Sequence, residues 1–217
     1  MSAFWEFLQA NSQMLQQAIV THLFYVFVSV AAGFVLGVVL GIALSRLPSQ
    51  YAAVLLPVLS VFQTIPGVVF IGLLFLQLGM VPITVIIALA IYATFPVLKN
   101  TYTGLTGVET KYIEAAKGCG MTRFQTLVRV ELPLALPSII GGLRLSTVYT
   151  VSWAVLASMI GLGGLGNFVY QGVESNNDLL IITGAIPAAI IAVVLGALID
   201  LLQRHVVPRG LRKGAEK

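Results

Sequence analysis

Residues 114–133 read EAAKGCGMTRFQTLVRVELP, and this polar stretch is the most informative part of the chain. Three residues separate residues 114–116 from Gly120, and nine further residues separate Gly120 from Val130-Glu131-Leu132-Pro133. Long apolar runs lie on both sides of the stretch. A chain that keeps a compact, glycine-containing helical hairpin between apolar runs exposes it outside the membrane, where a soluble partner can bind.

The composition is that of a protein embedded in a membrane. Of the 217 residues, 58% are hydrophobic and only 9% are charged, whereas soluble domains carry about 25% charged residues. The net charge of +4 is small. The basic residues lie near the ends of apolar runs rather than in one patch, which argues against nucleic-acid binding. The single cysteine, Cys119, excludes an intrachain disulfide.

Five apolar segments predict an all-α integral membrane protein that forms a single transmembrane domain over residues 1–217. An apolar helix of about 20 residues crosses a bilayer. The expected spans are residues 19–44, 53–78, 82–98, 134–160 and 179–202, with a cytoplasmic loop over residues 99–133. Three glycines at four-residue spacing in the first span, Gly33, Gly37 and Gly41, share one helix face. They let another helix approach closely, and packing within this chain is favoured there over contact with a second copy.

The second span is interrupted at Ile65-Pro66-Gly67. Residues 66–78 alone are too short to cross a bilayer at about 1.5 Å rise per residue. The segment is therefore either one kinked helix or an interfacial helix that leads into a span. Carbonyls freed at a proline break usually face protein or a water-filled path. Gln63, Thr64 and Pro66 accordingly either line a translocation path or satisfy the break locally.

Lysine and arginine residues predict the orientation of the spans. With the N-terminus outside and the C-terminus in the cytoplasm, none of these residues falls on the outer side, as the positive-inside rule requires. The residues then on the cytoplasmic side are Arg46, Lys99, Lys111, Lys117, Arg123, Arg129, Arg204, Arg209, Arg212, Lys213 and Lys217. Arg144 remains, in the first turns of the fourth span. For it we favour an extension to the cytoplasmic interface, or pairing with backbone carbonyls, over contact with a solute.

The polar loop is expected to form two short helices joined by a glycine turn. Residues 111–118 contain helix-forming residues, and Gly120 suits a turn of positive φ. Thr122 is a fair N-cap for a second, amphipathic helix over residues 122–130, with Gln125 as its capping-box partner.

Other residues of this hairpin have separate expected roles. Ala115 and Ala116 are small enough to let a partner surface come close. Glu114 either caps a helix or pairs with a basic residue, which is Lys117 or one on the partner. Pro133 ends the hairpin and begins the next span. A solvated loop without a partner is the alternative.

Tyr92, Tyr149 and Trp153 are candidates for an aromatic-lined translocation path, because aromatic faces attract quaternary ammonium ions. For each of them alone, aromatic packing or anchoring at the membrane interface is the more frequent role.

Residues 161–166, GLGGLG, match the glycine pattern of dinucleotide-binding proteins without its context. That interpretation requires a preceding strand, a following helix and a later acidic residue, whereas this segment follows a membrane span. We expect a flexible, close-packed outer loop that forms part of an external gate through Gly161, Gly163, Gly164 and Gly166. No cofactor is predicted. His22 and His205 lie at span ends without a second ligand at metal spacing, so no metal site is predicted either.

From about residue 46 to about residue 178, the chain resembles the permeases of ATP-binding-cassette (ABC) importers for the osmoprotectants glycine betaine, carnitine and choline. The resemblance is carried by QTIPG at 63–67, PVLKNTYTGL at 96–105, IEAA at 113–116, GMTR at 120–123, VELPLALP at 130–137 and GLGGLG at 161–166. Val130 stands where importer permeases carry Ile. Gly67 stands where relatives often carry Ser, which weakens inferences about solute contacts beside the break.

This resemblance implies a type I importer permease in the bacterial cytoplasmic membrane, working by alternating access. It also implies a second permease subunit, a copy or a sister, with two cytosolic ATPases and a separate extracellular or periplasmic substrate-binding protein. The residues that it assigns to ATPase coupling are Glu114, Ala115, Ala116, Gly120, Arg123, Leu132 and Pro133. Another small polar solute is the alternative substrate.

Two other classes of function are less well supported by the sequence. The chain has no Gly-Lys-Ser/Thr phosphate loop, so ATP and Mg²⁺ are expected on partner subunits and the chain is not expected to be an enzyme. A stand-alone secondary carrier usually shows internal repeats and ionisable residues within the membrane, and no clear repeat is visible here. An intramembrane enzyme would need paired carboxylates, a Ser–His pair or a His-rich cluster at membrane depth, and none is found.

Overall fold

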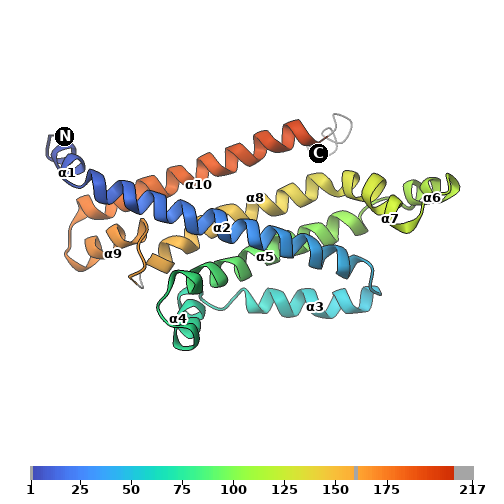
Figure 1. Cartoon of the computed structure of the whole chain (residues 1–217), viewed down its shortest axis with the longest axis horizontal. Coiled ribbons are helices and arrows are strands. Elements are labelled where there is room, and N and C mark those ends of the chain that lie inside the picture. Colours follow the sequence, from blue (N-terminus) through green and yellow to red (C-terminus); the bar gives the residue numbers. More distant parts are fainter. Residues whose placement is uncertain (1, 159–160, 208–217) are drawn as a thin grey trace.

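The computed structural model describes residues 2–158 and 161–207, and every regular element among them is a helix. The elements are α1 (Ser2–Ala10), α2 (Ser12–Ser45), α3 (Ser49–Phe62), α4 (Gly67–Leu78), α5 (Pro82–Thr106), α6 (Thr110–Gly118), α7 (Arg123–Thr126), the π-helical turn η1 (Leu127–Glu131), α8 (Leu132–Ala157), α9 (Gly166–Glu174) and α10 (Asp178–Val206). Figure 1 shows the long helices running along one axis, with α6 and α7 at one end and α1 and α9 at the other. The all-α prediction is confirmed.

Among the described residues, four helices are long and apolar enough to cross a membrane. They are α2, α5, the continuous helix Arg123–Ala157, and α10. A fifth span exists only if α3 and α4 are taken together, and these two helices are bent by 88° at their junction. Of the two forms expected for residues 53–78, the single kinked helix is corrected to two helices at nearly a right angle, and an interfacial helix leading into a span stays a prediction. Pro66 causes the corner, because it lacks an N–H and has an extended backbone, φ −56° and ψ 127°.

Helix α5 forms the centre of the bundle, packed between α2 and α8. The glycine face of α2 lies against α5. A Cβ added at Gly33, Gly37 or Gly41 would come within 2.6 Å of a side-chain carbon of α5. The expectation that these glycines pack within the chain is confirmed. Close approach of this kind replaces the hydrophobic driving force, which is absent between helices in lipid.

Hydroxyl groups join α5 to its neighbours across the same interfaces. Ser146 of α8 donates to the Ala93 carbonyl at 2.8 Å, and Ser138 donates to the Asn100 carbonyl at 2.8 Å. Polar groups at membrane depth have no water to bind, so partners inside the protein stabilise them.

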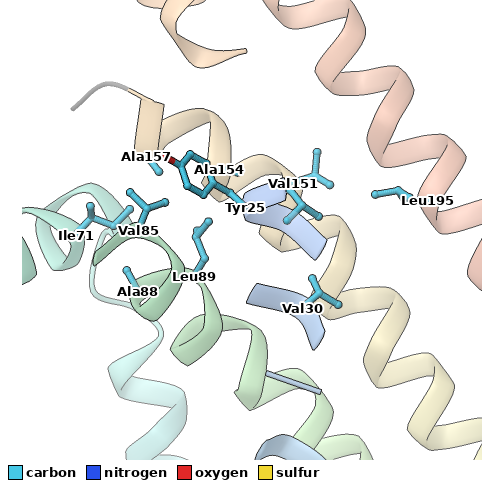
Figure 2. Close-up of a cluster of buried hydrophobic side chains, with 11 residues drawn as sticks. Tyr25, Val30, Ile71, Val85, Ala88, Leu89, Val151, Ala154, Ala157 and Leu195 are labelled. Carbon is cyan, nitrogen blue, oxygen red and sulfur yellow. The ribbon is translucent and has the colours of Figure 1, made fainter. Parts of the chain in front are cut away.

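The largest buried cluster lies where α2, α4, α5, α8 and α10 meet. Figure 2 shows side chains of α2, α4, α5 and α8 grouped around Leu89 and Tyr25, the latter only 4% exposed, with Leu195 of α10 at the edge of the group. Outward faces of α2 and α10 instead expose apolar residues such as Val39 and Val193, at 58% and 71%. This pattern fits a bundle surrounded by lipid.

Helix boundaries differ from the expected cytoplasmic loop over residues 99–133. Residues 99–106 continue α5, and α7, η1 and α8 form one unbroken helix. Pro133 therefore does not end the hairpin. A proline ring clashes with the carbonyl four residues earlier in a regular helix. Here the π-turn, with the Leu132 N–H bonded to the Leu127 carbonyl, widens the helix immediately before Pro133.

Candidate functional site

The turn of the α6–α7 hairpin is closed by its own backbone. Helix α6 ends with the Met121 N–H bonded to the Ala116 carbonyl at 3.0 Å and the Gly120 N–H bonded to the Lys117 carbonyl at 2.9 Å. These two bonds form a Schellman motif. Gly120 has φ 76°, as predicted, and a Cβ there would meet no other atom within 4 Å. The position therefore needs glycine for its backbone conformation and not for space.

Beyond the turn, α7 begins with the expected capping box. The Gln125 N–H donates to Thr122 Oγ1 at 3.3 Å, and the Thr122 N–H donates to Gln125 Oε1 at 2.9 Å. Two local sequence signals thus determine a rigid hairpin that projects from one end of the bundle (Figure 1).

The hairpin offers both charged and apolar side chains to solvent. Glu114 and Arg123 are exposed and form no ion pair with any described residue. Phe124 is 74% exposed, although it is aromatic. An exposed aromatic ring between unpaired charges is typical of a protein-binding surface.

Not every predicted coupling residue faces outward. Ala115 and Gly120 are exposed and Leu132 and Pro133 are half-buried, but Ala116 is only 4% exposed. Helix α6 packs against η1 and α7, and Ala116 is buried there, so only Ala115 leaves room for a partner.

An exposed ion pair lies at the base of the hairpin. The hydrogen bond from Lys111 to Glu109, with Nζ 2.6 Å from Oε2, raises the pKa of Lys111. Both side chains are more than half exposed, so this pair adds charge to the surface and little stability.

Glu131 of η1 makes a stronger contact with the end of α2. Its carboxylate accepts hydrogen bonds from both terminal nitrogens of Arg46, at 3.3 and 2.5 Å. The Glu131 side chain is 6% exposed and that of Arg46 is 45% exposed. The sequence did not predict this pair. The position of Glu131 directly before an apolar run was a signal that its carboxylate is buried and needs a partner. It ties the hairpin to the corner between α2 and α3.

The α3–α4 corner is closed by aromatic residues. The Tyr92 hydroxyl donates to the Ile65 carbonyl at 2.8 Å, and Gln63 Nε2 donates to the Tyr92 carbonyl at 3.4 Å. Thr64 bonds the Val61 carbonyl at 2.7 Å. The break is thus satisfied locally, one of the two roles that were predicted for it.

Four predicted path residues are nevertheless brought together beside this corner. A pocket of about 250 Å³ is lined by Gln63, Tyr92, Tyr149, Thr150 and Trp153. Thr64 and Pro66 do not line it. Sequence reasoning missed Thr150, which lies one helical turn before Trp153 on the same face of α8.

The position of the Trp153 ring depends on the absence of a side chain at Gly67. The Tyr92 and Trp153 rings stack, with centroids 4.5 Å apart and an angle of 18° between the planes. A Cβ at Gly67 would lie 1.5 Å from Trp153 Cζ3 and 1.7 Å from Cε3, so it would overlap the edge of the ring. Only glycine leaves room for the indole here.

The glycine loop, which was predicted to lie on the outer side, is closely packed at the opposite end of the bundle. Gly161, Gly163 and Gly164 have φ of 78°, 83° and 101°, and a Cβ at Gly166 would lie 2.0 Å from the Val155 carbonyl oxygen. The Tyr25 hydroxyl donates to the Leu162 carbonyl at 3.0 Å. The loop follows a helix, α8, and not the strand that a dinucleotide site requires.

Arg144 pairs with a residue that sequence reasoning overlooked. Its Nε lies 2.9 Å from Asp200 Oδ1 of α10. Asp200, six residues before the end of α10, is a partner that was not expected, and the extension of Arg144 to the cytoplasmic interface stays a prediction. The ion pair reduces the cost of a charge on a membrane helix.

Comparison with known proteins identifies the class. Residues 33–212 match the family described as "Binding-protein-dependent transport system inner membrane component". A glycine betaine/carnitine/choline transport system permease protein of Bacillus subtilis (strain 168) is 37% identical over 98% of this chain and 97% of its own length. A carnitine transport permease protein of Listeria monocytogenes is 39% identical over 100% of this chain and 99% of its own.

Solved structures show the same fold. Inward-facing structures of the MetNI methionine ABC transporter include a chain with a TM-score of 0.76 and 23% identity, covering 93% of this chain and 98% of that one. A chain of an amino acid ABC transporter crystallised with histidines has a TM-score of 0.76 at 20% identity, with the same coverage. The type I importer permease fold is confirmed.

Proposed function

Since this chain belongs to the family of binding-protein-dependent transport system inner membrane components, we propose that it forms the membrane route of an ABC importer for a quaternary ammonium solute. Relatives named for carnitine, for choline, and for glycine betaine, carnitine and choline together match over nearly the whole chain. Their names differ in the solute, so the proposal is made for the class, with another small polar solute as the alternative.

The observation that carries this proposal is the exposed hairpin at one end of the bundle. It is rigid, because it is closed by a Schellman motif and a capping box. It also presents an exposed aromatic ring between unpaired charges. These are the properties that a docking surface for a cytosolic ATPase requires. The chain itself supplies the route and hydrolyses no ATP.

Alternating access would follow from the way the hairpin is joined to the bundle. Helix α7 continues without a break into α8, and Glu131 binds Arg46 at the end of α2. A displacement of the hairpin would therefore move two spans together. Closure of two ATPases on ATP provides the differential binding energy that shifts the route between its two states. We propose a second permease subunit, a copy or a sister, facing this one.

The orientation follows from the ends of the bundle. The α6–α7 end carries Lys111, Lys117, Arg123 and Arg129, and the C-terminal end of α10 points in the same direction (Figure 1). The positive-inside rule puts that end in the cytoplasm and α9 with the N-terminus outside. The outer glycine loop would then meet the substrate-binding protein and act as a gate.

Reconstitution tests this function directly. The chain is co-expressed with an ATPase, a second permease and a binding protein, purified as a complex and placed in proteoliposomes with radiolabelled glycine betaine. We expect uptake that requires ATP on the side of the ATPases and also requires the binding protein. Uptake by the chain alone, driven by an ion gradient without ATP, would overturn the proposal in favour of a secondary carrier.

A further inference from the structure

The pocket beside the α3–α4 corner combines aromatic rings with uncharged polar groups. Its walls are the stacked rings of Tyr92 and Trp153, the half-exposed ring of Tyr149, and the polar groups of Gln63 and Thr150. We propose that it binds the quaternary ammonium head group of the solute during passage, an inference that rests on the proposed function.

The chemistry of the walls suits a positively charged head group. The lining contains no lysine, arginine, aspartate or glutamate, so the attraction for a positive group comes from the three aromatic side chains. Because no carboxylate holds it, the head group leaves as readily as it enters, as passage through a membrane requires. The volume of about 250 Å³ is below the roughly 300–1,000 Å³ of pockets for drug-sized ligands, which restricts the pocket to a small solute.

The pocket also lies at the right depth. Tyr92 lies ten residues after Pro82, the first residue of α5. At about 1.5 Å rise per residue this is roughly 15 Å along the helix, half of a hydrocarbon core of about 30 Å. With Pro82 taken as the edge of the hydrocarbon core, a head group bound here is midway across the membrane.

Gly67 is the residue that shapes this site. Its missing Cβ is the space that the Trp153 ring occupies. Any side chain at this position, including serine, would push the indole off Tyr92 and away from the pocket. Gly67 is therefore a specificity-determining residue, although it contacts no solute itself.

The chain carries its own reporter for a binding test. Its two tryptophans are Trp5 and Trp153, so Trp5→Phe leaves the pocket indole as the only source of tryptophan fluorescence. The full chain, in lipid nanodiscs, is titrated with choline and, separately, with 3,3-dimethyl-1-butanol, the neutral carbon analogue of choline. We expect a saturable change in fluorescence with choline and none with the neutral analogue.

Matched variants in this background separate the aromatic contact from folding. Tyr149→Leu should raise the half-saturating choline concentration about 3- to 30-fold, the range for one cation–π contact, while Tyr149→Phe keeps the ring and should shift it little. Gly67→Ala should abolish the response. Gly72→Ala, in the same helix, should preserve it, because a Cβ there would meet nothing within 4 Å.

Three results would overturn the site: an equal response to both ligands, no saturable response to choline, or an unchanged half-saturating concentration in Tyr149→Leu. If any of these occurs while the reconstituted complex still imports glycine betaine with ATP, the pocket fails and the importer assignment stands. Absence of ATP-driven uptake together with a normal choline response would instead overturn the importer function.

Discussion

Two glycines of this chain are required for opposite reasons. Gly120 has open space around its missing Cβ but a left-handed backbone, whereas Gly67 is packed under an indole ring. A substitution at Gly120 is therefore a test of backbone strain, and a substitution at Gly67 is a test of space. The distinction matters because the first belongs to the coupling hairpin and the second to the pocket.

At the hairpin, Gly120→Val should reduce ATP-driven uptake by roughly 5- to 30-fold, because a left-handed backbone costs an L-residue about 1–2 kcal/mol. Gly120→Asn should be milder, since asparagine adopts this conformation more readily. Initial rates of uptake in proteoliposomes measure the effect. Gly118→Ala is the control, because no atom lies within 4 Å of its Cβ position. Wild-type uptake by Gly120→Val would contradict the role of this turn.

Among the elements, η1 and the end of α2 are joined by one partly buried ion pair. The carboxylate of Glu131 is almost fully buried while Arg46 is half exposed, so the two partners depend on each other unequally. Removing the Arg46 side chain leaves the buried Glu131 carboxylate without its partner. Removing both side chains leaves no buried charge that needs a partner.

This asymmetry gives a prediction with a definite sign. Arg46→Leu should lower the free energy of unfolding by about 1–3 kcal/mol, the cost of an unsatisfied buried group. The double variant Arg46→Leu/Glu131→Leu should be more stable than Arg46→Leu alone. Chemical denaturation in detergent compares the two. If the double variant is the less stable, the buried carboxylate is not the source of the cost.

For the whole molecule, the feature that matters is the separation of its two ends. The α6–α7 hairpin lies at one end and the glycine loop with α9 at the other, and α2, α5, α8 and α10 connect them (Figure 1). A route that opens alternately to the two sides requires this division.

Cysteine labelling tests that division. The single cysteine, Cys119, is exposed in the hairpin, so a membrane-impermeant maleimide should label it in inside-out vesicles and leave it at background level in right-side-out vesicles. Ser175→Cys in a Cys119→Ser background is the matched control, because Ser175 is exposed between α9 and α10; it should show the reverse pattern. Labelling of Cys119 from outside would invert the proposed orientation.

Local features were predicted well from the sequence. The turn at Gly120, the capping box of Thr122 and Gln125, and the glycine face of α2 depend on residues within one or two helical turns, so spacing alone reveals them. Contacts between distant segments were not predicted: Asp200 for Arg144, and Arg46 for Glu131. The residue spacing within two helices does not determine their axial register, that is, which residues lie side by side when the helices pack.

The all-helical class, the apolar spans and the exposed hairpin follow from residue order, because helix periodicity, glycine turns and transfer into lipid act on short segments. The break at Pro66 is local, whereas the angle of 88° between α3 and α4, the burial of Ala116 and the packing of Trp153 over Gly67 arise only when the helices pack. Each depends on which side chain of one helix meets which gap in another, and that match is a property of three-dimensional packing.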